Sequence, residues 1–193
     1  MARAGLTAER LTRAAAELAD EVGFENVTVS ALARRFGVKD ASLYSHIRNV
    51  QDLKARVAVL ALAELADRAA AALAGRAGRN ALAAFASVYR DFAKEHPGMY
   101  AAAQFRLDPE TAAASAARRH AELTRAILHD YDLQEPDETD AVRLLGSVFH
   151  GYVSLEVAGA FSNHPRDIDA SWSRALDALD SALRNWPSNP PNG

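Results

Sequence analysis

The sequence predicts an all-α protein of about nine helices, with a small helix-turn-helix domain ahead of a larger helical bundle. Apolar residues recur at the spacing of an amphipathic helix along most of the 193 residues. Capping and turn residues interrupt that spacing, and almost no segment alternates apolar and polar residues as a strand would. We expect domains at 1–48 and 49–186, and a polar, proline-rich tail at 187–193 that does not fold alone.

Composition fits an ordinary globular protein, with 49% apolar and 24% charged residues. The absence of cysteine excludes disulfides and cysteine-bound zinc, and it fits the reducing cytoplasm, where we expect the protein to act. The N-terminus lacks the apolar core of a signal peptide, and the alanine-rich run at 57–74 carries three charged residues. We therefore expect no membrane partner.

Charge is distributed unevenly along the chain, whose formal net charge is −3. Residues 1–56 hold nine Lys/Arg and seven Asp/Glu, whereas residues 57–193 hold thirteen and eighteen. The N-terminal excess is modest, so affinity for DNA would come from placed phosphate contacts more than from a strongly basic surface.

The first helix is predicted over Ala8–Val22, with Thr7 as its N-cap and Gly23 as its stop. A second capping residue, Thr28, begins a helix that ends in a tight turn at Gly37. The apolar face of the first helix comprises Leu11, Ala14, Ala15, Leu18 and Val22, and that of the second comprises Val29, Leu32, Ala33 and Phe36.

A third short helix follows the turn and buries Leu43 and Ile47. Lys39, Ser42, Tyr44 and His46 are left to point outward. Two helices joined in this way form a helix-turn-helix, which places its second helix in the DNA major groove.

The later helices are delimited by caps, glycines and prolines. Asn49 caps a long helix that ends near Leu73, and a break follows at 75–78. The remaining helices are expected at about 82–93, 97–105, 109–128, 137–161 and 169–186.

The N-terminal motifs are Ala14-Ala-Ala-Glu-Leu, Gly23-Phe, Thr28-Val-Ser-Ala-Leu-Ala, Phe36-Gly-Val, Ser42-Leu-Tyr-Ser-His and Asp52-Leu. Together they resemble the DNA-binding domain of the tetracycline-repressor (TetR) family. The stretch from Phe149 to Phe161, with Asp169-Ala-Ser-Trp, resembles the Trp-His-Gly type of C-terminal ligand-binding domain, with phenylalanine in place of tryptophan. The resemblance implies a dimeric repressor that a small-molecule effector releases from operator DNA.

The resemblance also implies which residues contact DNA. Tyr44 is either a phosphate contact or part of the core, and His46 is either a phosphate contact or a packing residue. Asp40, where the family often has lysine, either caps the helix or accepts from a cytosine amino group. The candidate DNA-binding residues are Thr28, Arg34, Lys39, Asp40, Ser42, Tyr44, His46 and Lys54.

A ligand pocket is expected among the later helices, lined by aromatic and polar side chains. Each of these side chains could instead belong to the core. The imidazoles of His120 and His150 are the best candidates to orient a ligand. The full candidate set is Tyr89, Phe92, Met99, Tyr100, Phe105, His120, Phe149, His150 and Tyr152.

Three glycines, Gly146, Gly151 and Gly159, fall within the predicted helix at 137–161. Each costs up to ~1 kcal/mol in a helix interior, which is reasonable where two backbones approach closely. We therefore expect a homodimer through the last two helices, and hence a palindromic operator in double-stranded DNA.

Enzymatic motifs are not found in the sequence: it has no glycine-rich phosphate loop, nucleophile elbow or His-Glu-x-x-His. The histidines lack metal-ligand spacing, and the acidic run at 130–140 lacks the glycine of a calcium-binding loop. We expect no cofactor, no metal and no catalytic activity. Two alternatives to a repressor remain: a transcriptional activator of the same fold, or a helical bundle that binds small molecules without specific DNA recognition.

Overall fold

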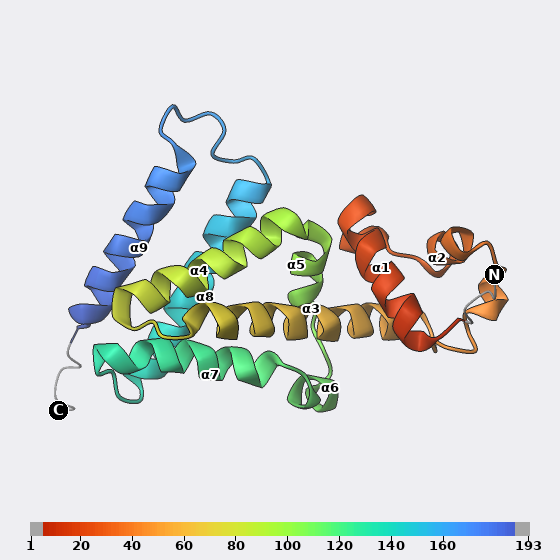
Figure 1. Ribbon diagram of the computed structural model, residues 1–193, viewed down its shortest axis with the longest axis horizontal. Helices are drawn as coiled ribbons and strands as arrows, with labels where there is room; N and C mark the ends of the chain where they lie inside the picture. Colours follow the sequence, from red (N-terminus) through yellow and green to blue (C-terminus); the bar gives the residue numbers. More distant parts are fainter. Residues whose placement is uncertain (1–5, 188–193) are drawn as a thin grey trace, which may run out of the picture. The chain divides into compact units, whose positions relative to one another are not determined.

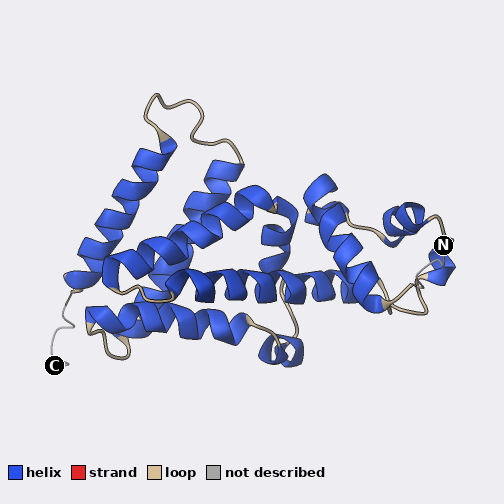
Figure 2. Ribbon diagram, viewed as in Figure 1, coloured by secondary structure: helices blue, strands red, loops and turns tan. Residues whose placement is uncertain are grey.

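The computed structural model describes residues 6–187, and this range contains helices and connecting turns but no strand (Figures 1 and 2). The predicted all-α class is confirmed. Residues 1–5, and the predicted tail beyond Pro187, lie outside the described residues. The helices are α1 (Ala8–Val22), α2 (Val29–Phe36), α3 (Val50–Leu73), α4 (Gly78–Glu95), α5 (Pro97–Ala103), α6 (Pro109–Ala114), α7 (Ala117–Leu128), α8 (Asp137–Val157) and α9 (Ile168–Arg184), with 3-10 helices η1 (Phe24–Asn26), η2 (Asp40–Ser42) and η3 (His129–Tyr131).

Local capping residues set the start of several helices where the sequence predicts them. The Thr7 hydroxyl accepts from the backbone N–H of Arg10 at 3.2 Å, and the Asn49 side chain accepts from the N–H of Asp52 at 2.9 Å. Gly23 follows α1 with a φ of 89°, which favours glycine. Val22 is exposed, contrary to prediction: it is the last residue of α1, and Phe24 beyond the turn is buried instead.

Two predicted helices end elsewhere in the structure. The single helix expected from residue 109 to 128 is divided into α6 and α7, because Ser115 adopts an extended backbone and its hydroxyl accepts from the N–H of Ala117 at 3.2 Å. The helix predicted to reach Phe161 ends at Val157, and Gly159 has a left-handed φ of 75°. Gly159 therefore lies beyond the helix and not within it.

The chain packs into two compact units. Unit 1 comprises the chain up to Asp67 together with Asp91–Arg119, and unit 2 comprises Arg68–Arg90 together with the chain from His120. These units divide the chain differently from the predicted domains, because α5 packs against α1 in unit 1. The predicted functional boundary after residue 48 stays a prediction.

In unit 1, α1 and α5 lie side by side (Figure 1). Gly98 of α5 is buried against the backbone of α1, where an added Cβ would lie 2.0 Å from the carbonyl carbon of Ala19. The carboxylate of Asp20 accepts from the N–H of Met99 at 2.9 Å and contacts Nδ1 of His96 at 2.8 Å. A side chain of α1 thus caps the first turn of α5.

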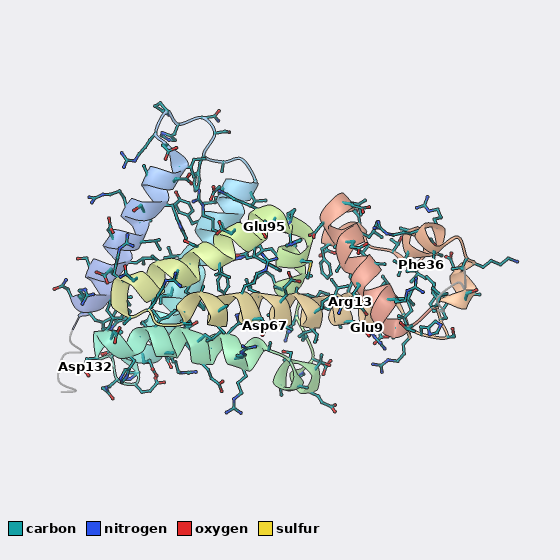
Figure 3. The ribbon with its side chains drawn as sticks, viewed as in Figure 1. Glu9, Arg13, Phe36, Asp67, Glu95 and Asp132 are labelled. Atoms are coloured by element: carbon teal, nitrogen blue, oxygen red, sulfur yellow. The ribbon has the colours of Figure 1, made fainter. Side chains whose placement is uncertain are left out.

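The solvent side of α1 carries ordinary surface ion pairs. Arg13 donates to the carboxylate of Glu9 at 3.2 Å, one helical turn away (Figure 3). Both side chains are exposed, so this pair contributes little to stability.

Unit 2 has its own apolar core, formed by parts of α3, α4, α7, α8 and α9. Phe149 of α8 and Trp172 of α9 are buried in it and have their ring centroids 6.2 Å apart. A buried arginine, Arg90, joins α4 to α8 and α9 by donating to Glu156 at 2.7 Å and to Asp169 at 2.6 Å. These hydrogen bonds, first of all that with Glu156, raise the pKa of Arg90 above its usual value, although burial opposes the shift.

Within residues 6–187, none of the helices combines the length and the hydropathy that crossing a membrane requires.

Candidate functional site

The helix-turn-helix begins with α2, whose N-terminus is capped as predicted. The Thr28 hydroxyl accepts from the N–H of Ala31 at 3.1 Å. Gly37 ends the helix in the left-handed conformation, with a φ of 65°, and Val38 donates to the carbonyl of Ala33 at 3.0 Å. This is the bonding of a glycine C-cap, and it reverses the chain toward the next element.

The segment after the turn forms a 3-10 helix, η2, and a further turn through His46, where the sequence predicts a helix. Its backbone bonds span three residues, as in Leu43 N–H to Asp40 carbonyl at 3.0 Å. No side chain caps its start, and the Ser45 hydroxyl donates to the Ser42 carbonyl at 2.9 Å, which competes with helical bonding. Leu43 and Ile47 are nevertheless buried, as predicted.

Most of the candidate DNA-binding residues are accessible on this motif. Tyr44 is 54% exposed, so within the described residues it is not a core aromatic. His46 is half-buried. Asp40 does not cap η2, because its carboxylate accepts from the Ser30 hydroxyl of α2. The exposed candidates are Thr28, Arg34, Lys39, Asp40, Ser42 and Tyr44.

Lys54 is placed differently from the prediction. Its side chain is buried, with Nζ 2.8 Å from the Glu25 carboxylate and 5.0 Å from the centroid of the Phe24 ring. The ammonium is therefore directed into unit 1, and we remove Lys54 from the candidate DNA contacts. By contrast, Arg34 and Lys39 make no ion pair with any residue in 6–187.

Other basic residues near the motif are already paired. Arg35 of α2 forms ion pairs at 2.7 Å with both Glu17 and Glu21 of α1. The hydrogen bond with Glu21 is the largest cause that raises the pKa of Arg35. Arg35 thus attaches α2 to α1 and is a poorer candidate than Lys39 for a phosphate contact.

Four of the predicted ligand-binding residues come together in unit 2. The Tyr89 hydroxyl lies 2.8 Å from Nδ1 of His120, and its ring centroid lies 6.4 Å from that of Phe149. Tyr152 joins the group through Trp172, with ring centroids 4.7 Å apart. The aromatic cluster is defined here as Tyr89, His120, Phe149, Tyr152 and Trp172.

Trp172 is the member that the sequence did not identify as a ligand contact. Its indole nitrogen is buried and has no hydrogen-bond partner among the described residues. Buried donors are almost always paired, so this one needs an explanation. Trp172 also belongs to the apolar stripe of α9 with Leu176 and Leu179, a spacing that predicts a core residue and gives no indication of a site.

The other predicted ligand residues do not join the aromatic cluster. Phe92, Met99 and Tyr100 are buried in unit 1, and burial raises the pKa of Tyr100 to about 12. Phe105 also lies in unit 1, with its ring centroid 5.7 Å from that of Phe24. His150 is exposed on α8, with Nδ1 3.4 Å from the Ser154 hydroxyl. The predicted set is therefore divided between the units.

Among the described residues, no cluster of three or more histidine, aspartate or glutamate side chains has an arrangement that could hold a metal ion.

Two family profiles match the chain. Residues 11–57 match "Bacterial regulatory proteins, tetR family", and residues 82–179 match "Tetracyclin repressor-like, C-terminal domain". An uncharacterized HTH-type transcriptional regulator of Bacillus subtilis, YobS, is 33% identical over 181 residues, which cover 94% of each chain. A second, from Mycobacterium tuberculosis, is 32% identical over 168 residues, covering 85% of this chain and 76% of that protein.

Solved structures show the same fold. A Rhodococcus protein of unknown function superposes with a TM-score of 0.77 at 22% identity, covering 95% of this chain and 98% of that one. TetR-Q116A from Acinetobacter baumannii, solved in complex with minocycline, superposes with a TM-score of 0.69 at 25% identity and covers 96% of this chain and 100% of that one.

Proposed function

The chain belongs to the TetR family of helix-turn-helix transcriptional regulators, and from that premise we propose that it is a dimeric repressor released from its operator by a small-molecule effector. The family assignment makes it a DNA-binding regulator and not an enzyme. The cytoplasmic location expected from the sequence gives such a regulator access to its operator.

One observation supports specific DNA recognition more than any other. The segment after Gly37 buries Leu43 and Ile47 and leaves Lys39, Ser42 and Tyr44 exposed. A polar, hydrogen-bonding surface on a firmly anchored segment is what base and phosphate contacts require. This observation favours a DNA-binding regulator over a bundle without DNA recognition, and it is equally compatible with an activator.

The direct test is binding of the purified protein to the DNA upstream of its own coding region, across a salt series. We expect binding at least ~1,000-fold tighter than to a random duplex of equal length, as is typical of specific recognition. Binding no tighter than the control would move the search to fragments selected from the whole genome. Failure of that selection as well would contradict the proposal.

Lys39→Ala and Tyr44→Ala are each expected to weaken operator binding by about tenfold or more, since a base or phosphate contact contributes ~1–3 kcal/mol. Both side chains are exposed, so the thermal unfolding temperature should stay unchanged. Fluorescence anisotropy with labelled operator measures the effect. Lys94→Ala, which removes one positive charge from the exposed side of α4, is the matched control. Equal affinity of the wild type and the three variants for the operator would refute the assignment of the recognition surface.

The proposal includes a homodimer through α8 and α9, for which α8 offers a suitable face. Leu144, Val148, Gly151 and Leu155 follow one another at helical spacing, on a different face from the buried Leu145 and Phe149. Leu144 and Leu155 are large exposed apolar residues. A Cβ added at Gly151 would meet nothing within 4 Å in the protomer, so internal packing does not require glycine there. Close approach of a helix from a second protomer would require glycine at this position.

Gly151→Leu is therefore expected to convert the dimer to a monomer, or to raise the dimer dissociation constant by at least about tenfold, an effect of ~1.4 kcal/mol. Sedimentation equilibrium at micromolar concentration measures this. Ala126→Leu, on an exposed position of α7, is the control for adding a large apolar side chain. Wild-type protein that sediments as a monomer would contradict the dimer, and with it the palindromic operator.

We place the effector site in unit 2, at the aromatic cluster. The unpaired Trp172 N–H and the Tyr89–His120 pair offer polar groups within an apolar surround, as a ligand pocket requires. The related TetR solved with minocycline supports a small-molecule ligand for this chain. The Trp-His-Gly resemblance of Phe149-His150-Gly151 stays a prediction within this proposal. Quenching of tryptophan fluorescence in a Trp186→Phe background would report an effector that binds beside Trp172.

A further inference from the structure

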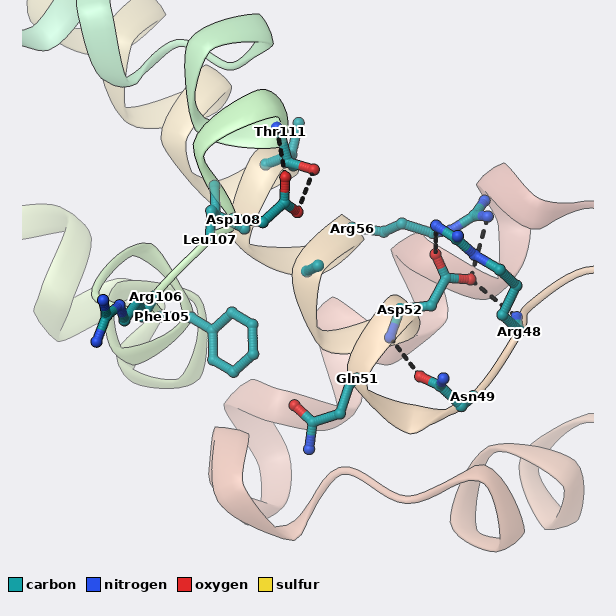
Figure 4. Close-up of a pocket in the computed structure, with 12 residues that line it drawn as sticks. Arg48, Asn49, Gln51, Asp52, Arg56, Phe105, Arg106, Leu107, Asp108 and Thr111 are labelled. Carbon is teal, nitrogen blue, oxygen red and sulfur yellow. Dashed lines mark hydrogen bonds and ion pairs between the residues drawn. The ribbon is translucent and has the colours of Figure 1, made fainter.

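A cavity of about 600 Å³ lies within unit 1, between the first turns of α3 and the segment that joins α5 to α6 (Figure 4). Its volume is in the range of small-molecule sites. One part of its lining is apolar and consists of Ala55, Val59, Phe105 and Leu107. The rest is polar or charged and consists of Arg48, Asn49, Gln51, Asp52, Arg56, Arg106, Asp108 and Thr111.

Two guanidinium groups in this lining share a single carboxylate. Asp52 lies 3.5 Å from the guanidinium of Arg48 and 3.2 Å from that of Arg56, and its own side chain is only 9% exposed. Figure 4 shows the side chains of Arg48 and Arg56 both reaching the Asp52 carboxylate. One positive charge at this position is therefore not balanced by Asp52.

The lining holds three arginines, Arg48, Arg56 and Arg106, against two aspartates, Asp52 and Asp108, so it carries one positive charge in excess. Asp108 accepts from the N–H of Thr111 at 3.0 Å and from its hydroxyl at 2.7 Å, so it caps α6 (Figure 4). The positive end of α3, a helix of 24 residues, adds to the potential on the same side of the cavity. The cavity thus combines an apolar wall with an excess of positive charge.

We propose that this cavity binds a small organic monoanion, namely a carboxylate whose aliphatic or aromatic body lies against Val59, Phe105 and Leu107. The carboxylate of the ligand pairs with Arg56, and Arg48 is shared between the ligand and Asp52. The two guanidinium groups then face two carboxylates in place of one. This site is separate from the effector site proposed at the aromatic cluster. It also adjoins the DNA-binding motif, because Arg48 directly follows the buried Ile47.

The test is a methyl NMR titration of the full-length protein, without DNA, using octanoate as the probe. We expect saturable shifts at Val59 and Leu107. Acetate has the charge without the body, and octanamide has the body without the charge. Both should bind at least about tenfold more weakly, acetate because it buries no apolar body against the lining, and octanamide because it has no charge to pair with the arginines. Octanamide that binds as tightly as octanoate would overturn the proposal.

Two substitutions at Arg56 test whether octanoate binding depends on the positive charge of this side chain. Arg56→Gln should weaken octanoate binding by about tenfold, and Arg56→Lys should restore most of it, since a lysine keeps the charge but not the fork geometry. Arg143→Gln, an exposed arginine of α8, should have no effect. Octanoate shifts confined to Leu176 and Leu179 of unit 2, or an affinity insensitive to Arg56→Gln, would contradict the site. Neither result would bear on operator recognition, because no DNA is present.

Discussion

Gly98→Ala is expected to lower the free energy of unfolding by about 3 kcal/mol or more, one of the two largest effects that we predict. The added Cβ would lie 2.0 Å from both the carbonyl carbon and the oxygen of Ala19. These are backbone atoms, so no side-chain rotation can relieve the overlap, and α5 must move away from α1. Urea denaturation at fixed protein concentration measures the loss.

The control is Ala101→Ser, which adds one heavy atom to the exposed side of the same short helix. We expect it to change stability by no more than about 0.5 kcal/mol. Alanine ordinarily favours a helix over glycine by about 1 kcal/mol, so a stabilised Gly98→Ala protein would show that α1 and α5 are not in the close contact described here.

The movement of α5 in Gly98→Ala also has a local consequence. Asp20 of α1 caps the first turn of α5 through the N–H of Met99, and displacement of α5 breaks this bond. Because the helix-turn-helix and α5 belong to the same compact unit, the variant should bind operator more weakly at temperatures where it remains folded.

Arg90→Met is expected to cost about 3–5 kcal/mol, because it leaves the buried carboxylate of Glu156 without its guanidinium. Arg90 has two anionic partners, Glu156 of α8 and Asp169 of α9, so its loss also removes one of the polar links between α4 and α9 within unit 2. The free energy of unfolding, again from urea denaturation, is the quantity to measure.

Arg79→Met is the matched control, because Arg79 also lies on α4 and also pairs with a carboxylate of α9, Asp177 at 2.7 Å. Both partners of this pair are partly exposed, and we expect a loss of no more than about 1 kcal/mol. The double variant Arg90→Met/Glu156→Leu should recover most of the stability, since it removes both buried charges. Equal losses in Arg90→Met and Arg79→Met would refute the importance of the buried network.

Several elements could be predicted because their determinants are local in the sequence. Thr7, Thr28 and Asn49 each cap the helix that begins directly after them, and Gly37 ends α2 by adopting a conformation that glycine favours. The apolar spacing that buries Leu43 and Ile47 is also read within a few residues. For such features the neighbouring chain supplies the physical cause.

Other features could not be predicted because their partners are distant in sequence. Lys54, predicted from the sequence to contact DNA, is buried and pairs with Glu25. The residues next to Lys54 in the sequence give no indication of this partner. Likewise, the spacing of Trp172 is that of a core residue, and only the packed unit shows an indole N–H without an acceptor. The candidate ligand set was divided between two units for the same reason, since helical spacing does not specify which helices meet.

The sequence by itself determined the helical class, the helix-turn-helix and the family, since these rest on periodicity, capping residues and short motifs. Only the tertiary structure decided which charges are buried and which glycine is indispensable. Gly98 illustrates the difference: in the sequence it is the second residue of the helix predicted at 97–105, whereas in the structure it is the point where α5 meets the backbone of α1. Burial and close approach depend on which distant segments pack together, and that is a property of the folded chain.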